Sequence, residues 1–243
     1  MIGTFCFLFP SANSISLMYH GVNDSEKSIF ISRDIFENQL KYMHENNISV
    51  VGENDLNSGI LENNVCMHLT FDDGYEDNFT TVFPLLQKYS FRATIFIATG
   101  FLGKEFKYGL SFISKSQLQE MARSNLITWG GHTITHPKLD LLSYKEQEKE
   151  IVGNKEELES LLSREIDVFA PPFGRYNENT IKILKKYNFK RSYVTKYGKL
   201  SLNNQYEIMR VPVMKSNANH FSLLNKDGYF KYKSFVSYVK GIR

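Results

Sequence analysis

Two adjacent carboxylates stand at the end of an apolar segment. Asp72 and Asp73 follow the run 65–69, which is typical of a buried strand, and precede a helical pattern that opens near residue 75. Close like charges oppose joint ionisation, and burial raises the pKa of a carboxyl group. A bound cation would relieve both effects, so the pair predicts further metal ligands elsewhere in the chain.

Candidate ligands follow in a second polar segment. His132 and His136 are four residues apart, so they can converge on one ion if the backbone between them makes one helical turn. Imidazole nitrogen is a good ligand for Zn²⁺. One carboxylate and two imidazoles, with positions left open for water, have the composition of a catalytic metal site.

Three segments in this order resemble the motifs of a known family. Residues 70–74 (TFDDG) and 132–136 (HTITH) resemble the first two motifs of the polysaccharide deacetylases, the NodB-type carbohydrate esterases. Residues 169–174 (FAPPFG) resemble the third motif, and the likeness extends from about residue 16 to about residue 213. The resemblance implies a hydrolase that removes N-acetyl groups from an amino-sugar-containing glycan, with an N-acetylated oligo- or polysaccharide as its partner.

The resemblance also implies the metal site. Asp73, His132 and His136 are expected to hold one divalent ion, with Zn²⁺ as the default and Co²⁺, Ni²⁺ or Mn²⁺ as alternatives. Asp72 is then the expected general base, taking a proton from a water molecule that the metal activates. Asp140 lies near enough in sequence to be considered as the carboxylate that orients a ligand imidazole.

The third motif implies the oxyanion site. In the family a backbone N–H at this motif stabilises the oxyanion, and in this chain that places Pro172 and Phe173 against the substrate. The motif usually begins with an arginine that holds the base carboxylate, but Ala170 occupies that position here. We expect Arg210 to orient Asp72 instead, through a charge-assisted hydrogen bond.

The general acid is a second departure. The family usually supplies it from a late Leu-x-His motif, which this chain lacks, and its one late histidine is His220. His20 follows Met18 and Tyr19, as in the branch that includes poly-N-acetylglucosamine deacetylases. The ordinary histidine pKa of about 6.5 suits a general acid, and we expect His20 to protonate the leaving amine.

Apolar periodicity predicts alternating strands and helices, which favour a parallel sheet. The expected strands are 14–20, 48–51, 65–69, 91–98, 126–129, 167–170, 189–195 and 206–213, and the expected helices are 33–46, 77–89, 114–124, 143–162 and 177–187. In this scheme the motifs fall at the carboxyl ends of strands, where α/β folds place their chemistry. The resemblance narrows the fold to α/β, a distorted (β/α) barrel of about seven strands in a single domain. Pro84 is expected to kink its helix or to begin a later turn.

Composition fits one globular domain of 243 residues, with 42% hydrophobic residues and a net charge of +3 that is too small to suggest nucleic acid. We divide the chain into an apolar N-terminal extension (1–13), the NodB-like domain (14–215) and a basic, aromatic tail (216–243). The extension is shorter than a usual signal segment, so the compartment, cytoplasmic or exported, stays open, as does the oligomeric state. The tail is interpreted as a docked segment rather than a membrane surface.

Four side chains are expected only to pack. Cys6 and Cys66 are interpreted as free thiols, and Trp129, the single tryptophan, is expected to pack near the metal motif. His44 and His68 receive no role in the chemistry.

Two alternative functions stay open. One is a deformylase or an O-acetyl esterase acting on a lipid- or nucleotide-linked sugar. The other is a catalytically silent glycan-binding relative, which the missing motif residues favour and the intact Asp72 argues against. Turnover of an acetylated amino sugar would distinguish an enzyme from the silent relative.

Overall fold

The computed structural model describes residues 13–58, 60–63, 65–106 and 110–223. Of the predicted N-terminal extension it includes only residue 13. Of the predicted tail it includes residues 216–223, and residues 224–243 lie outside the described part. Cys6 lies outside it as well.

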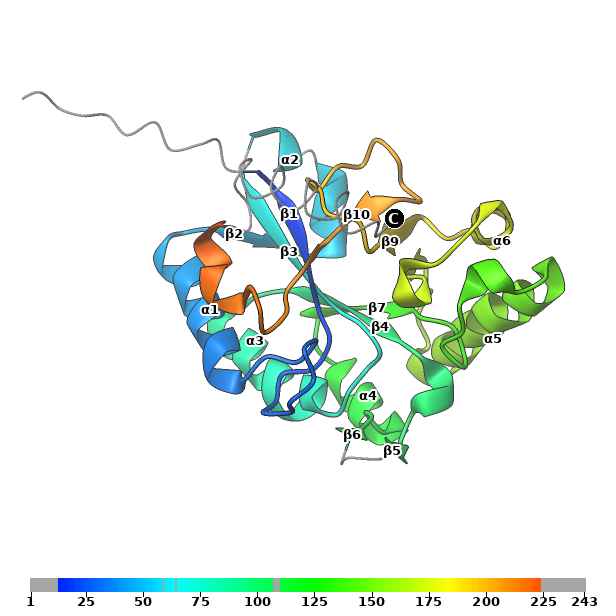
Figure 1. Cartoon of the computed structure of the whole chain (residues 1–243), viewed down its shortest axis with the longest axis horizontal. Helices are drawn as coiled ribbons and strands as arrows, with labels where there is room; N and C mark the ends of the chain where they lie inside the picture. The colour runs from blue at the N-terminus through cyan, green and yellow to red at the C-terminus, as the bar shows by residue number, and fades with distance from the viewer. Residues whose placement is uncertain (1–12, 59, 64, 107–109, 224–243) are drawn as a thin grey trace, which may run out of the picture.

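Seven parallel strands form a closed barrel (Figure 1), which confirms the predicted single-domain α/β fold. Its members in spatial order are β1 (Ile15–Tyr19), β3 (Cys66–Phe71), β4 (Ala93–Ile97), β7 (Ile127–Gly131), β8 (Val168–Phe169), β9 (Arg191–Val194) and the divided strand β10 (Ile208–Met209) and β11 (Val211–Pro212). Because β10 pairs with β9 while β11 pairs with β1, the divided strand closes the ring.

In the described part of the chain, three further short strands lie outside the ring. β2 (Ser49–Val51) pairs in parallel with the first half of β3. β5 (Glu105–Phe106) and β6 (Leu110–Ser111) form a separate antiparallel pair.

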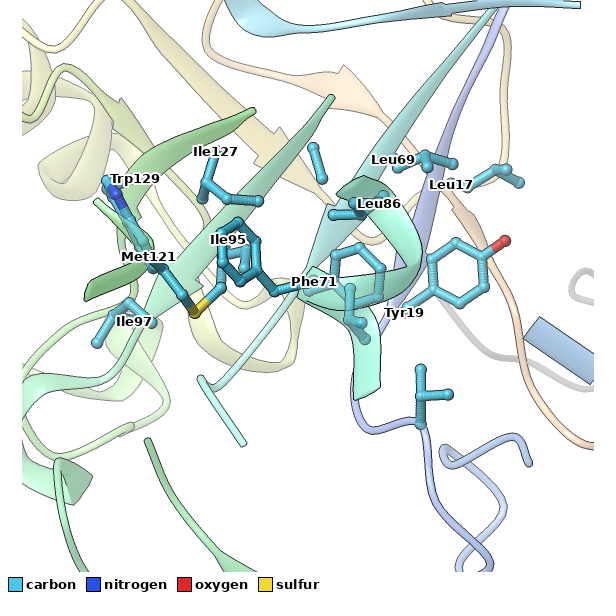
Figure 2. Packing of buried hydrophobic residues seen from close by; sticks show 14 of the residues in the cluster. Leu17, Tyr19, Leu69, Phe71, Leu86, Ile95, Ile97, Met121, Ile127 and Trp129 are labelled. Atoms are coloured by element: carbon cyan, nitrogen blue, oxygen red, sulfur yellow. The ribbon is translucent and has the colours of Figure 1, made fainter. Parts of the chain in front are cut away.

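The strands alternate between two environments. Leu17, Leu69 and Ile95 point outward, and Figure 2 shows them with Leu86 and Met121, which come from the covering helices. The alternate positions point into the barrel and are largely polar: Ser16 pairs in register with His68, and Thr70 with Thr94. Strand alternation therefore separates an apolar outer core from a polar interior.

The helices surround the barrel. They are α1 (Arg33–Glu45), α2 (Ile60–Asn63), α3 (Phe83–Tyr89), α4 (Lys115–Met121), α5 (Tyr144–Leu162) and α6 (Glu178–Lys186). Short 3₁₀ turns are η1 (Glu53–Ser58), η3 (Thr99–Phe101), η4 (Leu139–Leu141), η5 (Pro172–Gly174) and η6 (Ala218–Leu223). Among the described residues, none of the helices has the length and apolar character that crossing a bilayer requires.

The segment around Pro84 differs from the expectation of a kinked helix. Residues Asn78–Val82 form a π-helical turn, η2, and α3 begins only at Phe83. Pro84 therefore lies in the first turn of α3, directly after the π-helical turn, which ends with a hydrogen bond from the Phe83 N–H to the Asn78 carbonyl. The alternative prediction, that Pro84 begins a later turn, describes this arrangement.

Trp129 and Cys66 pack as expected. Trp129 is 4% exposed and belongs to the outer core, and the Cys66 side chain is fully buried. Neither residue is an exposed platform for a ligand.

Candidate metal centre and active site

The predicted site residues converge at the carboxyl edge of the barrel. Asp72 and Asp73 follow β3, His132 follows β7, and His20 follows β1. These strands are parallel, so their carboxyl ends open on the same side of the barrel. The topology therefore brings together residues that are far apart in the sequence.

Asp73, His132 and His136 form a cluster that fits a cation. Asp73 Oδ1 lies 3.3 Å from His132 Nε2 and 3.1 Å from His136 Nε2, and the three candidate ligand atoms lie within 4.8 Å of one another. Asp73 Oδ1 and His132 Nε2 are buried without a hydrogen-bond partner of good geometry among the described residues. A divalent ion between these atoms would satisfy both, and this set of two nitrogens and one oxygen suits Zn²⁺.

The ring of His132 is oriented by a backbone group. Its Nδ1–H donates a hydrogen bond of 2.6 Å to the Ala170 carbonyl, which leaves Nε2 facing Asp73. The considered partner, Asp140, instead forms an ion pair with Arg175, with contacts of 2.6–3.0 Å. The expectation for Asp140 was therefore wrong for His132, because the carboxyl end of β8 is already adjacent to the ring.

The cluster carries a negative potential that favours positive charge. Burial by itself would lower the pKa of His132, but the contact of its ring with the Asp73 carboxylate and the negative charges of Asp72 and Asp73 raise this pKa overall. Burial would likewise raise the pKa of Asp73, yet the two histidines hold it well below its usual value. The electrostatics of the triad therefore favour a cation between the three side chains.

Asp72 is held by a buried arginine. Arg210 is 0% exposed, and its Nη1 and Nη2 donate to Asp72 Oδ1 and Oδ2 at 2.6 and 2.8 Å. Nη1 also donates to Thr70 Oγ1 at 3.2 Å, and the guanidinium lies over the Phe96 ring. Burial would raise the pKa of Asp72, but the charge of Arg210, with its hydrogen bonds and the charges of His132 and His20, outweighs burial and keeps this pKa below the usual value. The expected contact between Arg210 and Asp72 is present. Ala170, which follows β8, has no side-chain group that could make this contact in its place.

A cavity of about 520 Å³ opens above these groups. Its polar wall contains Asp72, Asp73, His20, His132 and His136, and its apolar wall contains Met18, Ile29, Tyr75, Phe173, Pro212 and Met214. Concave sites of this size with a few convergent polar groups commonly bind small ligands or one unit of a polymer. Pro172 is buried, and among the described residues it does not line this cavity.

Phe173 lies at the rim of the cavity. Its side chain is 58% exposed, and its ring meets the His136 ring edge-on at 4.6 Å. The backbone of Phe173 has a φ of 59° and is followed by Gly174 at 65°. This turn is what brings the third motif against the metal cluster.

The two candidate acids lie in different surroundings. His20 is half-buried and lines the cavity with Asp72 and Asp73. His220 belongs to η6, which packs against α1: Gln39 Nε2 donates to the Ala218 carbonyl at 2.9 Å. His20, in the wall of the cavity, is therefore better placed to act as the general acid than a residue of η6.

Sequence reasoning missed Tyr75 and Met214. Tyr75 follows Gly74 directly, so its place beside the first motif was a usable signal. Its ring stacks on Phe112 at 4.7 Å. Met214 follows β11, and nothing in its sequence context marks it as part of the cavity.

Comparisons with known proteins point to one family. Residues 62–192 match the family model described as polysaccharide deacetylase. YxkH of Bacillus subtilis (strain 168) is 29% identical over 202 residues, which cover 81% of this chain and 70% of that protein. The poly-beta-1,6-N-acetyl-D-glucosamine N-deacetylase of Staphylococcus aureus (strain MRSA252) is 25% identical over 234 residues, 90% of this chain and 76% of that protein.

A solved structure shares the fold. IcaB from Ammonifex degensii superimposes with a TM-score of 0.81 at 23% identity, over 89% of this chain and 99% of that one. The arrangement of strands and helices described above is therefore the one found in that protein.

Proposed function

This chain belongs to the polysaccharide deacetylase family, and from that premise we propose that it is a metal-dependent hydrolase of N-acetyl groups on an amino-sugar polymer. The observation that carries the proposal is that one cavity contains both a possible metal site and an oriented carboxylate. The Asp73, His132 and His136 triad lies beside Asp72, which Arg210 holds in a fixed orientation.

The residues of the cavity divide the chemistry among them. A divalent ion held by the triad would polarise the amide carbonyl and make a coordinated water more acidic. Asp72, kept ionised by Arg210, accepts the proton of the attacking water. Arg210 fixes the direction of the carboxylate with two parallel hydrogen bonds.

The later steps fall to residues on the opposite walls. The backbone N–H of Phe173 stabilises the negative charge that develops on the carbonyl oxygen. His20 gives a proton to the departing amine nitrogen, which could not leave as an anion near neutral pH. Pro172 holds the turn that presents Phe173.

The substrate class comes from the relatives. The Staphylococcus aureus protein is named for poly-β-1,6-N-acetylglucosamine, and we propose a polymer of this kind as the substrate. The early histidine and the late arginine match the branch that contains such enzymes, which supports the same choice. The intact pair of Asp72 and Arg210 argues for an enzyme rather than a silent binder.

The test is release of acetate and of free amine from β-1,6-linked N-acetylglucosamine oligomers. Metal-loaded protein should release the two products in equal amounts, and removal of the metal with a chelator should stop both. Release of acetate without new amine would indicate an O-acetyl esterase instead. Release of neither product by loaded protein would contradict the proposed function.

A further inference from the structure

The loop that carries two of the proposed metal ligands has an unfavourable backbone. In residues 132–136, Thr133 has a φ of 67° and His136 a φ of 59°. A residue other than glycine in this region costs on the order of 1–3 kcal/mol and persists only when its surroundings hold it there. The loop therefore needs support from outside itself.

Part of that support comes from Asn154 of α5, which is 0% exposed. Its Nδ2 donates to the Thr133 carbonyl at 2.7 Å and to the Ile97 carbonyl at 2.9 Å. Its Oδ1 accepts the backbone N–H of His132 at 3.1 Å. One side chain thus joins the end of β4 to the first two residues of the loop.

Glu150, one turn earlier on α5, holds the middle of the loop. Its Oε2 accepts the backbone N–H groups of Ile134 and Thr135 at 2.9 and 2.8 Å. Its Oε1 accepts the Thr135 hydroxyl at 2.7 Å. Three donors of the loop therefore end on one carboxylate, and hydrogen bonds to a charged acceptor are stronger than those between neutral groups.

Two glycines allow the helix to approach this closely. A Cβ on Gly131 would lie 2.7 Å from Asn154 Oδ1, and a Cβ on Gly153 would lie 2.8 Å from Ile134 Cδ1. Glycine inside a helix costs about 1 kcal/mol relative to alanine. Gly153 thus lets the end of the Ile134 side chain lie directly against α5.

We infer that Glu150 and Asn154 are positioning residues that hold the 132–136 loop in its ligand-presenting shape before a metal ion arrives. The inference rests on the metal site of the proposed function. It adds that metal affinity depends on α5, a helix that supplies none of the three ligands. Partners that orient metal ligands typically change metal affinity or activity by about 10–100-fold when they are removed.

Glu150→Ala is the most direct test, because the glutamate is only partly buried and the fold can tolerate its loss. Affinity for Zn²⁺ is measured by competition with a chromophoric chelator, and stability by urea unfolding of the metal-free protein. We expect Zn²⁺ affinity to fall by about 10–100-fold while the unfolding midpoint of the metal-free protein stays near that of the wild type. Unchanged affinity in a folded variant would overturn the inference.

Two matched variants complete the design. Glu150→Gln keeps an oxygen for the backbone N–H groups of Ile134 and Thr135, so it should recover most of the lost affinity. Glu156→Ala removes the same charge from an exposed position of the same helix, and its affinity should equal that of the wild type. Equal losses in Glu150→Ala and Glu156→Ala would assign the effect to net charge and overturn the positioning role.

Hydrogen exchange gives a second readout that needs no metal. In the metal-free Glu150→Ala variant, the amides of Ile134 and Thr135 should exchange faster than in the wild type, while the amides of β3 keep their protection. Unchanged exchange at the two loop amides would contradict the inference. These measurements require no turnover, so a wild type that binds Zn²⁺ through this loop but releases no acetate would contradict only the proposed activity.

Discussion

Arg210 and Asp72 form the buried ion pair on which the proposed base depends. A buried pair adds little net stability over an apolar pair, but removing one partner leaves an uncompensated charge and typically costs about 3–5 kcal/mol. The pair is therefore better understood as a device that fixes the direction and the ionisation of Asp72. Among the described residues there is a second buried pair, Arg191 with Glu53, joined by a contact of 2.5 Å.

Arg210→Met should lower turnover and leave metal content unchanged. Loss of the guanidinium removes the charge that keeps the pKa of Asp72 low despite burial, so the acid limb of the pH profile of kcat/KM should move to higher pH. The measurement is that profile together with metal content per chain.

Arg191→Met is the matched control, because it breaks the other buried pair. It should lower the free energy of unfolding without moving the acid limb. An acid limb that stays in place in Arg210→Met, or a metal content that falls with it, would contradict the proposed orientation of Asp72.

His20→Gln should slow amide hydrolysis far more than ester hydrolysis. General acid catalysis contributes roughly 10²–10⁴-fold when the leaving group must be protonated, and an amine must be. A 4-nitrophenolate leaving group needs no proton, so turnover of 4-nitrophenyl acetate should change little. His220→Gln is the comparison variant, and a larger amide-specific loss there than in His20→Gln would reassign the acid.

For individual residues, the sequence allowed prediction of those positions whose role depends on the chemical type of the side chain. Asp73, His132 and His136 could be chosen from their types and spacing, and the structure brings them together. The Ala170 carbonyl that orients His132 could not be predicted, because it depends on where β8 ends beside β7. Asn154 left a weak signal, since it is a polar residue on the buried stripe of α5 that includes Ile151 and Leu158, a stripe that also holds the polar Gln147.

The divided strand β10 and β11 is the element that connects fold and site. The alternation of residues 206–213 predicts one strand, but the structure interrupts it at Arg210, where pairing changes from β9 to β1. The interruption depends on closure of the whole barrel, which local sequence does not encode. It also directs Arg210 into the interior, where Asp72 lies.

The start of α5 was predictable, because its capping box is local. The Ser143 side chain accepts the Glu146 N–H, and the Glu146 carboxylate accepts the Ser143 N–H at 2.8 Å. Ser143→Ala should lower the free energy of unfolding by about 1 kcal/mol, the usual value of an N-cap. Urea denaturation measures the change, with Ser160→Ala at an exposed position of the same helix as control. Equal losses in the two variants would show that the cap contributes nothing of its own.

The barrel as a whole encloses a polar interior around His68. Ser16 Oγ lies 3.3 Å from its Nδ1, and Thr94 Oγ1 lies 2.9 Å from its Nε2. Burial, together with the charges of Arg210 and Arg191, lowers the pKa of His68 to about 3. The imidazole is therefore neutral in the folded protein near neutral pH.

This depressed pKa makes stability depend on pH. An unfolded histidine has a pKa of about 6.5, so between about pH 6.5 and 3 the unfolded chain binds a proton at His68 that the folded chain does not. Stability from this group is complete above about pH 6.5 and falls as pH decreases, by up to about 1.4 kcal/mol per pH unit. His68→Gln should make unfolding less sensitive to pH in this window, as measured by urea titrations from pH 7 to 4.

His44→Gln, which removes an imidazole from the exposed face of α1, is the matched control. An equal change of slope in both variants, or an unchanged slope in His68→Gln, would contradict the role given to burial inside the barrel.

Much of the architecture was predictable because it rests on repeated local patterns. Alternation along β1, β3 and β4 and the periodicity of α1, α5 and α6 led to the right elements, and the parallel order followed from their succession. The π-helical turn before Pro84 was not predicted, since it depends on how residues 78–82 fit against the barrel. Closure also could not be derived from periodicity, and the resemblance to the family supplied it.

Asp72 is the proposed base of a metal-dependent deacetylase. The most direct measurement compares acetate release from β-1,6-linked N-acetylglucosamine oligomers by wild type and Asp72→Asn, both loaded with Zn²⁺ and both assayed for metal content. We expect one ion per chain in each protein and a loss of turnover of roughly 10²-fold or more in the variant, the usual contribution of a general base. Turnover by Asp72→Asn equal to that of the wild type, at equal metal content, would contradict the account.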